Sequence, residues 1–241
     1  MTNEQLKSIL FIDIETAPIC SRWEELSENM QILWNKKAKT LRTAPDEEFD
    51  SARLFEEKGG IFSEFSKVVC IGIGSLVFQE NEWVFRLKSI AEKDEKILLN
   101  NFLSILDRFV SGNKEMRFCG HNIKEFDLPF LCRRMIVNEI ALPSPLKLHN
   151  KKPWEITHID TLEFWKFGDY KNYTSLALLA EILGIPSPKN DIDGSMVGKV
   201  FWEEQNLERI ATYCLQDVLT TAKVFMRLSE GKSFDYNIIY V

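Results

Sequence analysis

Apolar and polar positions along the chain follow the patterns of buried strands and amphipathic helices. Residues 8–15 form an almost unbroken apolar run, which is typical of a strand buried on both faces of a sheet. The only charges in this run are Asp13 and Glu15. The pattern also predicts strands at 68–78, 83–87, 118–122 and 157–160, and helices at 95–110, 124–139, 175–184 (with Thr174 as N-cap) and 207–228.

This order of elements predicts the α/β class, with a mixed five-stranded sheet flanked by helices. A chain of 241 residues is long enough for one large domain, so we predict a single domain over 1–241. The stretch at about 17–66 has mixed charge and a Gly59-Gly60 break, and we interpret it as a helical insertion. It would either form one wall of a site beside the first strand or pack at a distance from it.

Asp13 and Glu15 are two residues apart on the first strand, so their side chains point to the same face of the sheet. Burial would bring two like charges together, and desolvated carboxylates then either take up protons or bind a hard cation through their oxygens. The pair therefore favours a metal site. The alternative is a strand that ends in solvent, with Glu15 capping the next turn.

A further acid, Asp127, falls in the first turn of the helix at 124–139, beside its apolar stripe. It lies near the end of the strand that His121 and Asn122 complete. The helix dipole also favours a carboxylate at this place, so an ordinary helix-start charge is the alternative. No second histidine or cysteine stands at zinc-site spacing from His121, which favours a hydrogen-bonding role for that residue.

Tyr213 and Asp217 are four residues apart in the long helix, so they stack on one face at the border of its apolar stripe. Alone, they could be a boundary tyrosine and an exposed aspartate. Together with Asp13, Glu15 and Asp127, they complete the order Asp-x-Glu, Asp, Tyr-x-x-x-Asp. A two-metal phosphodiesterase needs such a set.

With these motifs the chain resembles the DEDDy group of 3′-5′ exonucleases, and more closely the proofreading-exonuclease domain of family B DNA polymerases. The sister DEDDh group has a histidine five residues before the last aspartate, whereas this chain has Thr212. The resemblance covers most of 8–16 and 67–228 and leaves 17–66 with little to match. Further matching stretches are 68–74, 175–185 and 193–195.

The resemblance implies a ribonuclease H-like fold and a site for two Mg²⁺ or Mn²⁺ ions. Tyr213 is implied to position the attacking water. His121, Asn122 and Phe126 are candidate contacts for the terminal nucleotide. The metal ligands that the resemblance implies are Asp13, Glu15, Asp127 and Asp217.

The implied activity is hydrolysis of nucleic acid from its 3′ end, with single-stranded DNA favoured, releasing nucleoside 5′-monophosphates. A polymerase or helicase is a candidate partner. The alternatives are an RNA-specific exonuclease, a nuclease of the same fold that cuts internally, and a non-catalytic nucleic-acid-binding or scaffold subunit. The 2′-hydroxyl contact that separates RNA from DNA is not identifiable in the sequence.

The formal net charge of −6 is unusual for a protein that binds phosphates, because lysine and arginine carry most non-specific binding. An enzyme that holds only a few terminal nucleotides needs few such contacts, so the charge argues against a long duplex footprint. Candidate contacts that combine basic and aromatic residues are Lys147, Lys151, Lys152 and Trp154, and Lys166, Phe167, Tyr170 and Lys171, with solvated loops as the alternative.

Five cysteines without a close-spaced pair predict free thiols in a reducing compartment, and we expect a cytoplasmic protein. No apolar stretch approaches the roughly 20 residues of a membrane span, and no secretory signal is expected.

Overall fold

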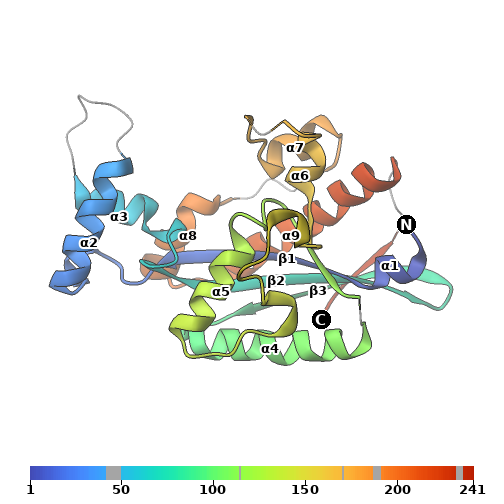
Figure 1. The fold of residues 1–241 in the computed structure, drawn as a ribbon, viewed down its shortest axis with the longest axis horizontal. Coiled ribbons are helices and arrows are strands. Elements are labelled where there is room, and N and C mark those ends of the chain that lie inside the picture. Colours follow the sequence, from blue (N-terminus) through green and yellow to red (C-terminus); the bar gives the residue numbers. More distant parts are fainter. Residues whose placement is uncertain (42–49, 114, 170, 187–190, 232–235) are drawn as a thin grey trace.

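The computed structural model describes residues 1–41, 50–113, 115–169, 171–186, 191–231 and 236–241. A mixed sheet lies between helices, with α4 and α5 on one face and α9 on the other (Figure 1). Its six strands have the order β5-β4-β1-β2-β3-β6. They are β1 (Ile9–Pro18), β2 (Ser66–Gln79), β3 (Glu82–Ala91), β4 (Arg117–Gly120), β5 (Ile159–Asp160) and β6 (Asn237–Tyr240).

The α/β class and the mixed pairing of the predicted sheet are confirmed, but the predicted count of five strands is wrong by one. β1 pairs antiparallel with β2 and parallel with β4, as a mixed sheet requires. The additional strand, β6, pairs in parallel with β3. All four of its residues are exposed, so it lacks the alternation of buried and exposed positions from which a strand is predicted.

The long predicted helices are present, with ends that differ by a few residues. They are α4 (Glu95–Gly112), α5 (Asp127–Val137) and α9 (Leu207–Glu230). The shorter helices are α1 (Asn3–Lys7), α2 (Glu28–Ala38), α3 (Ser51–Lys58), α6 (Thr161–Lys166), α7 (Leu176–Ile182) and α8 (Val197–Lys199). Single turns are η1 (Trp23–Glu25), η2 (Lys39–Leu41), η3 (Gly59–Ile61), η4 (Ser144–Leu146), η5 (Pro153–Glu155), η6 (Gly194–Met196) and η7 (Val200–Glu204).

The prediction that Thr174 caps α7 is wrong, because the neighbouring Ser175 is the N-cap. The Ser175 Oγ accepts a hydrogen bond from the Leu178 N–H at 3.3 Å. The Thr174 carbonyl instead lies 2.9 Å from His121 Nε2. Thr174 therefore ties the entry of α7 to the end of β4.

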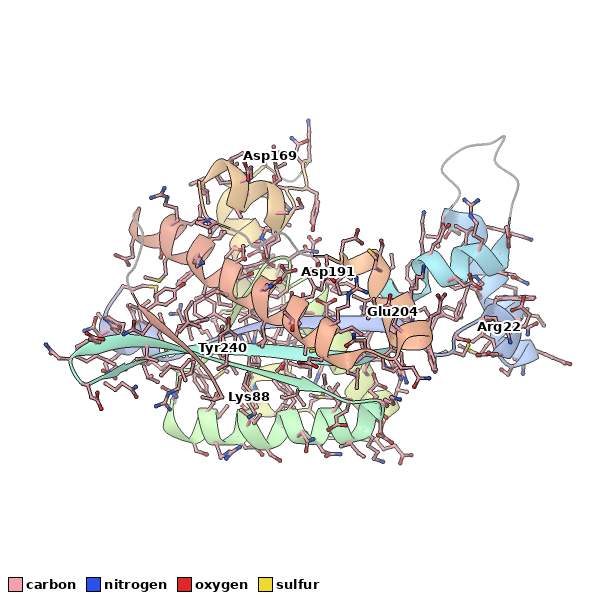
Figure 2. All side chains as sticks on the ribbon, turned by 180° about the vertical axis from the view of Figure 1, so that it is seen from behind. Arg22, Lys88, Asp169, Asp191, Glu204 and Tyr240 are labelled. Carbon is pink, nitrogen blue, oxygen red and sulfur yellow. The ribbon has the colours of Figure 1, made fainter. Side chains whose placement is uncertain are left out.

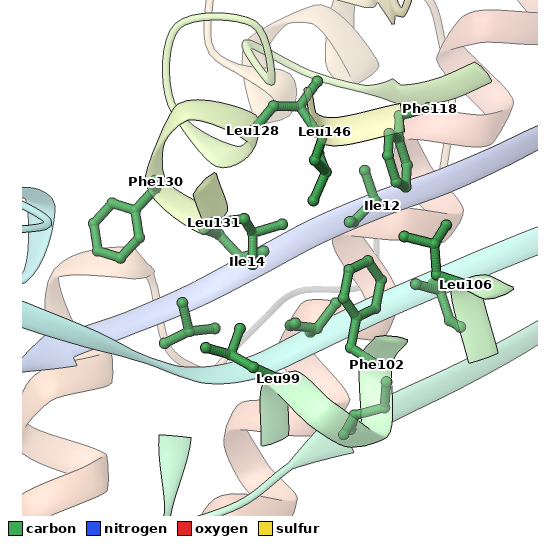
Figure 3. Packing of buried hydrophobic residues seen from close by; sticks show 14 of the residues in the cluster. Ile12, Ile14, Leu99, Phe102, Leu106, Phe118, Leu128, Phe130, Leu131 and Leu146 are labelled. Carbon is green, nitrogen blue, oxygen red and sulfur yellow. The ribbon is translucent and has the colours of Figure 1, made fainter. Parts of the chain in front are cut away.

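The sheet face beneath α4 and α5 holds a large apolar core (Figure 3). β1 contributes every second side chain to it, because successive side chains of a strand point to opposite faces. The intervening acids, Asp13 and Glu15, therefore face α9. The labelled core residues are Ile12, Ile14, Leu99, Phe102, Leu106, Phe118, Leu128, Phe130, Leu131 and Leu146.

On the opposite face, α9 approaches the sheet closely at Gly72, which pairs with Asp13 across β1 and β2. A Cβ at Gly72 would lie 2.8 Å from the Cys214 Sγ and 2.9 Å from a Val218 methyl group. No side chain fits in that space without displacing α9. Gly72 therefore sets the separation between α9 and the strand that carries Asp13.

The predicted insertion holds α2 and α3 at one end of the sheet (Figure 1). Its residues 42–49 lie outside the described ranges. The described part has a small core of its own, in which the Trp34 ring packs edge-on against Phe55 at 5.4 Å. A hydrogen bond of 2.7 Å from the Thr16 hydroxyl to the Gly60 carbonyl attaches it to β1.

A buried ion pair, Arg134–Glu95, links α5 to α4. The Arg134 guanidinium donates to the Glu95 carboxylate at 2.7 Å and to the Ser63 carbonyl at 2.9 Å. The same carboxylate accepts the Val68 N–H at 2.8 Å. The network thus joins both helices, β2 and the end of the insertion.

Arg134→Met is expected to lower the free energy of unfolding by about 3–5 kcal/mol, because it leaves the buried Glu95 charge without its cation. The matched control, Arg133→Met, removes an exposed arginine from the same helix. Urea unfolding of both variants would measure the difference. Equal stability of the two variants would contradict the role given to the pair.

All five cysteines are free thiols, as predicted. Among the described helices, none combines the length and apolar content that crossing a bilayer would require.

Candidate active site

The carboxylates of Asp13 and Glu15 lie on the α9 face of β1, as their spacing predicts. An oxygen of each, together with the Cys214 Sγ on α9, falls within 4.8 Å of the others. The Cys214 thiol lies 3.5 Å from the Asp13 carboxylate. A strand and a helix that are distant in sequence therefore meet at this point.

Asp127 reaches β1 from the start of α5. The last β1 residue paired with β4 is Phe11, so the following part of that edge of β1 has no strand beside it. There the Ile14 N–H donates to the Asp127 Oδ1 at 3.1 Å, and both groups are buried. The carboxylate takes the place of a strand partner, which fixes it beside Asp13 and Glu15.

A tight turn between β4 and α5 directs Asp127 toward β1. Asn122 has the left-handed φ of +63°, which asparagine tolerates better than most residues. The buried Asp160 carboxylate accepts the N–H groups of Asn122 at 2.8 Å and Lys124 at 3.1 Å. It also caps α6 through the Leu162 N–H at 3.0 Å. Asp160 is thus a structural acid that orders the turn.

Tyr213 and Asp217 lie one helical turn apart on α9, and their side chains are close enough to shift each other's pKa. Burial raises the pKa of Asp217 to about 6, while the neighbouring Tyr213 hydroxyl acts in the opposite direction. Burial, followed by the charges of Asp217, Glu15 and Asp13, raises the pKa of Tyr213 well above its usual range. The phenol is therefore neutral at physiological pH.

The four acids form a carboxylate cluster: Asp13, Glu15, Asp127 and Asp217. Burial raises the pKa values of Asp13 and Glu15 well above the ordinary range, and the neighbouring carboxylates raise them further. Burial also raises the pKa of Asp127 to about 7, against the effect of hydrogen bonds from its own N–H and that of Ile14. Hard divalent cations would relieve this repulsion, and the oxygen-rich donor set fits them.

A pocket of about 450 Å³ opens above the carboxylate cluster. Asp13 and Asp217 reach its surface, whereas Glu15 and Asp127 do not line it and are buried. This size suits one small ligand. The described lining residues are Asp13, His121, Tyr173, Ser175, Leu176, Ala177, Ile192, Asp193, Tyr213, Asp217 and Thr220.

Of the three predicted substrate contacts, only His121 lines this pocket. Its Nδ1 lies 2.9 Å from the Thr161 hydroxyl and its Nε2 lies 2.9 Å from the Thr174 carbonyl. Burial lowers the pKa of His121, so the ring is neutral and donates from Nε2 to the carbonyl. Asn122 forms the turn described above, and Phe126 packs against Phe130 with ring centroids 5.4 Å apart. Their contacts with substrate stay predictions.

None of the candidate basic residues is among the described residues that line the pocket. The Lys152 ammonium lies over the exposed Trp154 ring at 5.2 Å, and Phe167 is almost fully exposed. Tyr170 lies outside the described residues. The sequence did not indicate the lining residues Tyr173, Ile192 and Thr220. Tyr173 precedes α7 in a segment without periodicity.

The free energy of unfolding of the metal-free protein is expected to fall as the pH rises through the range of these pKa values. In the folded chain the pKa is about 6 for Asp217 and about 7 for Asp127, both above the ordinary value of 3.8. From roughly pH 4 to 7 the folded state therefore binds more protons than the unfolded state, and their loss is destabilising. Urea unfolding with chelator at pH 5 and pH 8 would measure this.

Addition of Mn²⁺ should raise stability more at pH 8 than at pH 5, because protons compete with the cation for the same oxygens. Asp127→Asn should flatten the pH dependence seen with chelator. A wild-type protein that is more stable at pH 8 than at pH 5 without metal would contradict the repulsion described for the cluster.

Comparison with known proteins identifies relatives of this fold and sequence. The family model described as "Predicted 3'-5' exonuclease related to the exonuclease domain of PolB" matches residues 61–234, which is more than half of the chain. This match includes Asp127, Tyr213 and Asp217. Asp13 and Glu15 precede it and join these residues through the pairing of β1 with β2.

One similar solved structure is the family B DNA polymerase from the hyperthermophilic archaeon Pyrobaculum calidifontis. The likeness covers 90% of this chain and 24% of the polymerase, with 15% identity and a TM-score of 0.51. At this identity it supports the ribonuclease H-like fold. A comparison with curated proteins gives no match. The predicted resemblance is confirmed: the chain belongs to the family of predicted 3′-5′ exonucleases related to the exonuclease domain of PolB.

Proposed function

We propose that this chain removes nucleotides from the 3′ end of single-stranded DNA, releases nucleoside 5′-monophosphates, and uses two Mg²⁺ or Mn²⁺ ions. The observation that carries the proposal is the convergence of Asp13 and Glu15 with Tyr213 on α9, beside a pocket for one small ligand. Asp127 and Asp217 complete the buried negative charge. An acidic site of this kind could serve several metal-dependent activities, and family membership favours an exonuclease.

The carboxylate cluster would hold the cations. By resemblance, Asp13 would bridge the two ions, Glu15 and Asp217 would complete one site, and Asp127 would hold the second ion. When bound, the ions would supply an activated water and stabilise charge on the phosphodiester oxygens. With the cations bound, the acids would be ionised, because the cations would neutralise their repulsion.

Tyr213 would position the attacking water. Tyr213 lines the pocket together with Asp13 and Asp217, and its raised pKa keeps the phenol neutral. A neutral phenol both donates and accepts hydrogen bonds, so it can orient a water molecule without adding charge.

We further propose single-stranded substrate and, as partner, a polymerase or helicase that supplies the 3′ end. The acidic net charge and the absence of lysine or arginine from the described pocket lining favour recognition of few nucleotides. An RNA end would present the same phosphodiester, so RNA belongs in the test.

Digestion of 5′-labelled single-stranded DNA and RNA with Mg²⁺, Mn²⁺ or chelator tests the proposal. The expected result is progressive shortening from the 3′ end that chelator abolishes, with a circular single strand left intact. Cutting of the circle would indicate an internal nuclease. Activity that survives chelation, or early release of the 5′ label as mononucleotide, would overturn the proposal.

A further inference from the structure

Tyr173 is an aromatic residue that lines the pocket above the carboxylate cluster. It belongs to the α6–α7 lobe, which we define as the described residues of 161–182. This lobe lies on the α9 side of the sheet (Figure 1), and Figure 2 shows Asp169 at its outer end. Tyr173 is 66% exposed although it lines the pocket. A large side chain in this state leaves much of its ring surface available to a ligand.

His121 holds the position of Tyr173. The two rings pack edge-on, with centroids 6.5 Å apart and an interplanar angle of 70°. The His121 ring is fixed between the Thr161 hydroxyl and the Thr174 carbonyl. Thr174 is the residue next to Tyr173. Ser175 then caps α7, and α7 packs on α9 through Leu179. The tyrosine is thus supported from its backbone and from one ring edge.

The other lining residues of the pocket differ in chemistry. Asp13 and Asp217 contribute acidic groups from the carboxylate cluster. Leu176, Ala177 and Ile192 contribute apolar surface, and the first two follow Tyr173 closely in the chain. The other polar lining groups with recorded partners are held internally, since Asp193 accepts the Ser195 N–H at 2.8 Å and Ser175 accepts the Leu178 N–H. Such a surface suits a flat, uncharged ring.

Burial raises the pKa of Tyr173, and the charges of Asp127 and Asp160 raise it further. The phenol therefore adds no negative charge beside a polyanion. Tyr173 lines the same pocket as Asp13 and Asp217, which places it beside the carboxylate cluster.

We propose that Tyr173 stacks on the base of the terminal nucleotide and thereby positions the last phosphodiester over the carboxylate cluster. This inference rests on the proposed function and specifies how the same site recognises its substrate. Stacking on an aromatic ring is tolerant of base identity, because every base has a π-face. A pocket of about 450 Å³ fits one unpaired base better than a base pair, which makes a single-stranded end the preferred substrate.

The test compares wild-type protein with Tyr173→Leu, Tyr173→Phe and the control Phe167→Leu. Phe167 is an 88% exposed aromatic residue of the same lobe that is not among the described lining residues. Each protein binds a fluorescent single-stranded oligonucleotide in Ca²⁺, ending either in a normal nucleotide or in an abasic residue. The affinity of each protein for Mn²⁺ is measured separately by calorimetry.

Tyr173→Leu is expected to weaken binding of the normal end by roughly 5- to 100-fold, the range for one base stacked on an aromatic ring. The abasic end should bind all four proteins alike, and Tyr173→Phe and Phe167→Leu should resemble wild type. The affinity for Mn²⁺ should be the same in Tyr173→Leu as in wild type, because Tyr173 is not among the proposed metal ligands.

The role of Tyr173 would be overturned if Tyr173→Leu bound the normal end as tightly as wild type does. It would also be overturned if the substitution weakened binding of the abasic end as much as binding of the normal end. Circular dichroism would show whether Tyr173→Leu is folded. If it is not, binding of the normal and abasic ends by Tyr173→Phe and Tyr173→Ser would test the role of Tyr173 instead. A wild-type protein that does not hydrolyse DNA in Mg²⁺ or Mn²⁺ would instead contradict the proposed function, while the binding comparison would still test the role of Tyr173.

Discussion

Asp13→Ala is expected to leave a folded protein with less than about a tenth of the wild-type single-turnover rate, and losses at metal sites are usually much larger. Asp13 is the acid that we propose to hold both ions, so its removal would affect both at once. The charges of Asp127 on α5 and Asp217 on α9 both raise the pKa of Asp13, so it interacts with acids from both helices.

The same substitution is expected to stabilise the protein in chelator at pH 8. It removes one of several buried like charges, whose repulsion is absent from the unfolded chain. Mn²⁺ should then raise the stability of the variant less than that of wild type. The control Asp107→Ala removes an exposed acid from α4 and should match wild type in both assays. A tenth or more of wild-type activity in Asp13→Ala would show that the site is misplaced.

Tyr213→Phe is expected to lower turnover by about 10²–10⁴-fold, the usual range for a positioned group that exchanges a proton. The substitution removes only the hydroxyl, so the affinity for Mn²⁺ should stay close to that of wild type. Asp217→Asn should lower both turnover and the affinity for Mn²⁺, because it removes a charged oxygen ligand from the proposed site. Calorimetric Mn²⁺ titration and single-turnover rates of the two variants would separate these roles.

Tyr240→Phe is the matched control for Tyr213→Phe, because it removes a hydroxyl from an exposed tyrosine of β6 (Figure 2). It should change neither measurement. Unchanged turnover in Tyr213→Phe would leave Tyr213 with a packing role and the water-positioning group unidentified. A loss of Mn²⁺ affinity in Tyr213→Phe as large as in Asp217→Asn would make Tyr213 part of the metal site.

The sequence could predict those parts of the site that a single periodicity determines. The two-residue spacing of Asp13 and Glu15 places both on one face of β1, and the four-residue spacing of Tyr213 and Asp217 places both on one face of α9. The meeting of these two faces depends on Gly72, whose missing side chain allows α9 to approach. That contact is a property of packing, so only the family resemblance indicated it beforehand.

Other features have no local pattern from which they could be predicted. β6 is exposed at every position, so burial gives it no periodicity. Tyr173 lies in a segment without regular structure, and its importance comes from its place beside the pocket. Asp160 is the last residue of the predicted strand at 157–160, a position that alone does not separate a capping acid from a site acid. Its hydrogen bonds to three N–H groups identify it as the acid that orders the turn before Asp127.

The insertion illustrates a choice that the sequence left open. No residue of 17–66 is among the described residues that line the pocket over the carboxylate cluster. The described part instead packs around Trp34 and attaches at Thr16 and Ser63. Within the described chain, this arrangement favours the distal packing role over the wall of the site.

The most direct test of the central claim is a crystal structure with Mn²⁺ and a nucleoside 5′-monophosphate, with anomalous difference density recorded for manganese. The account predicts two peaks beside the Asp13 carboxylate, one toward Glu15 and Asp217 and one toward Asp127, with the phosphate between α9 and the ions. Absence of manganese at Asp13, or peaks only at exposed acids elsewhere, would contradict the claim that these residues form a two-metal hydrolytic site.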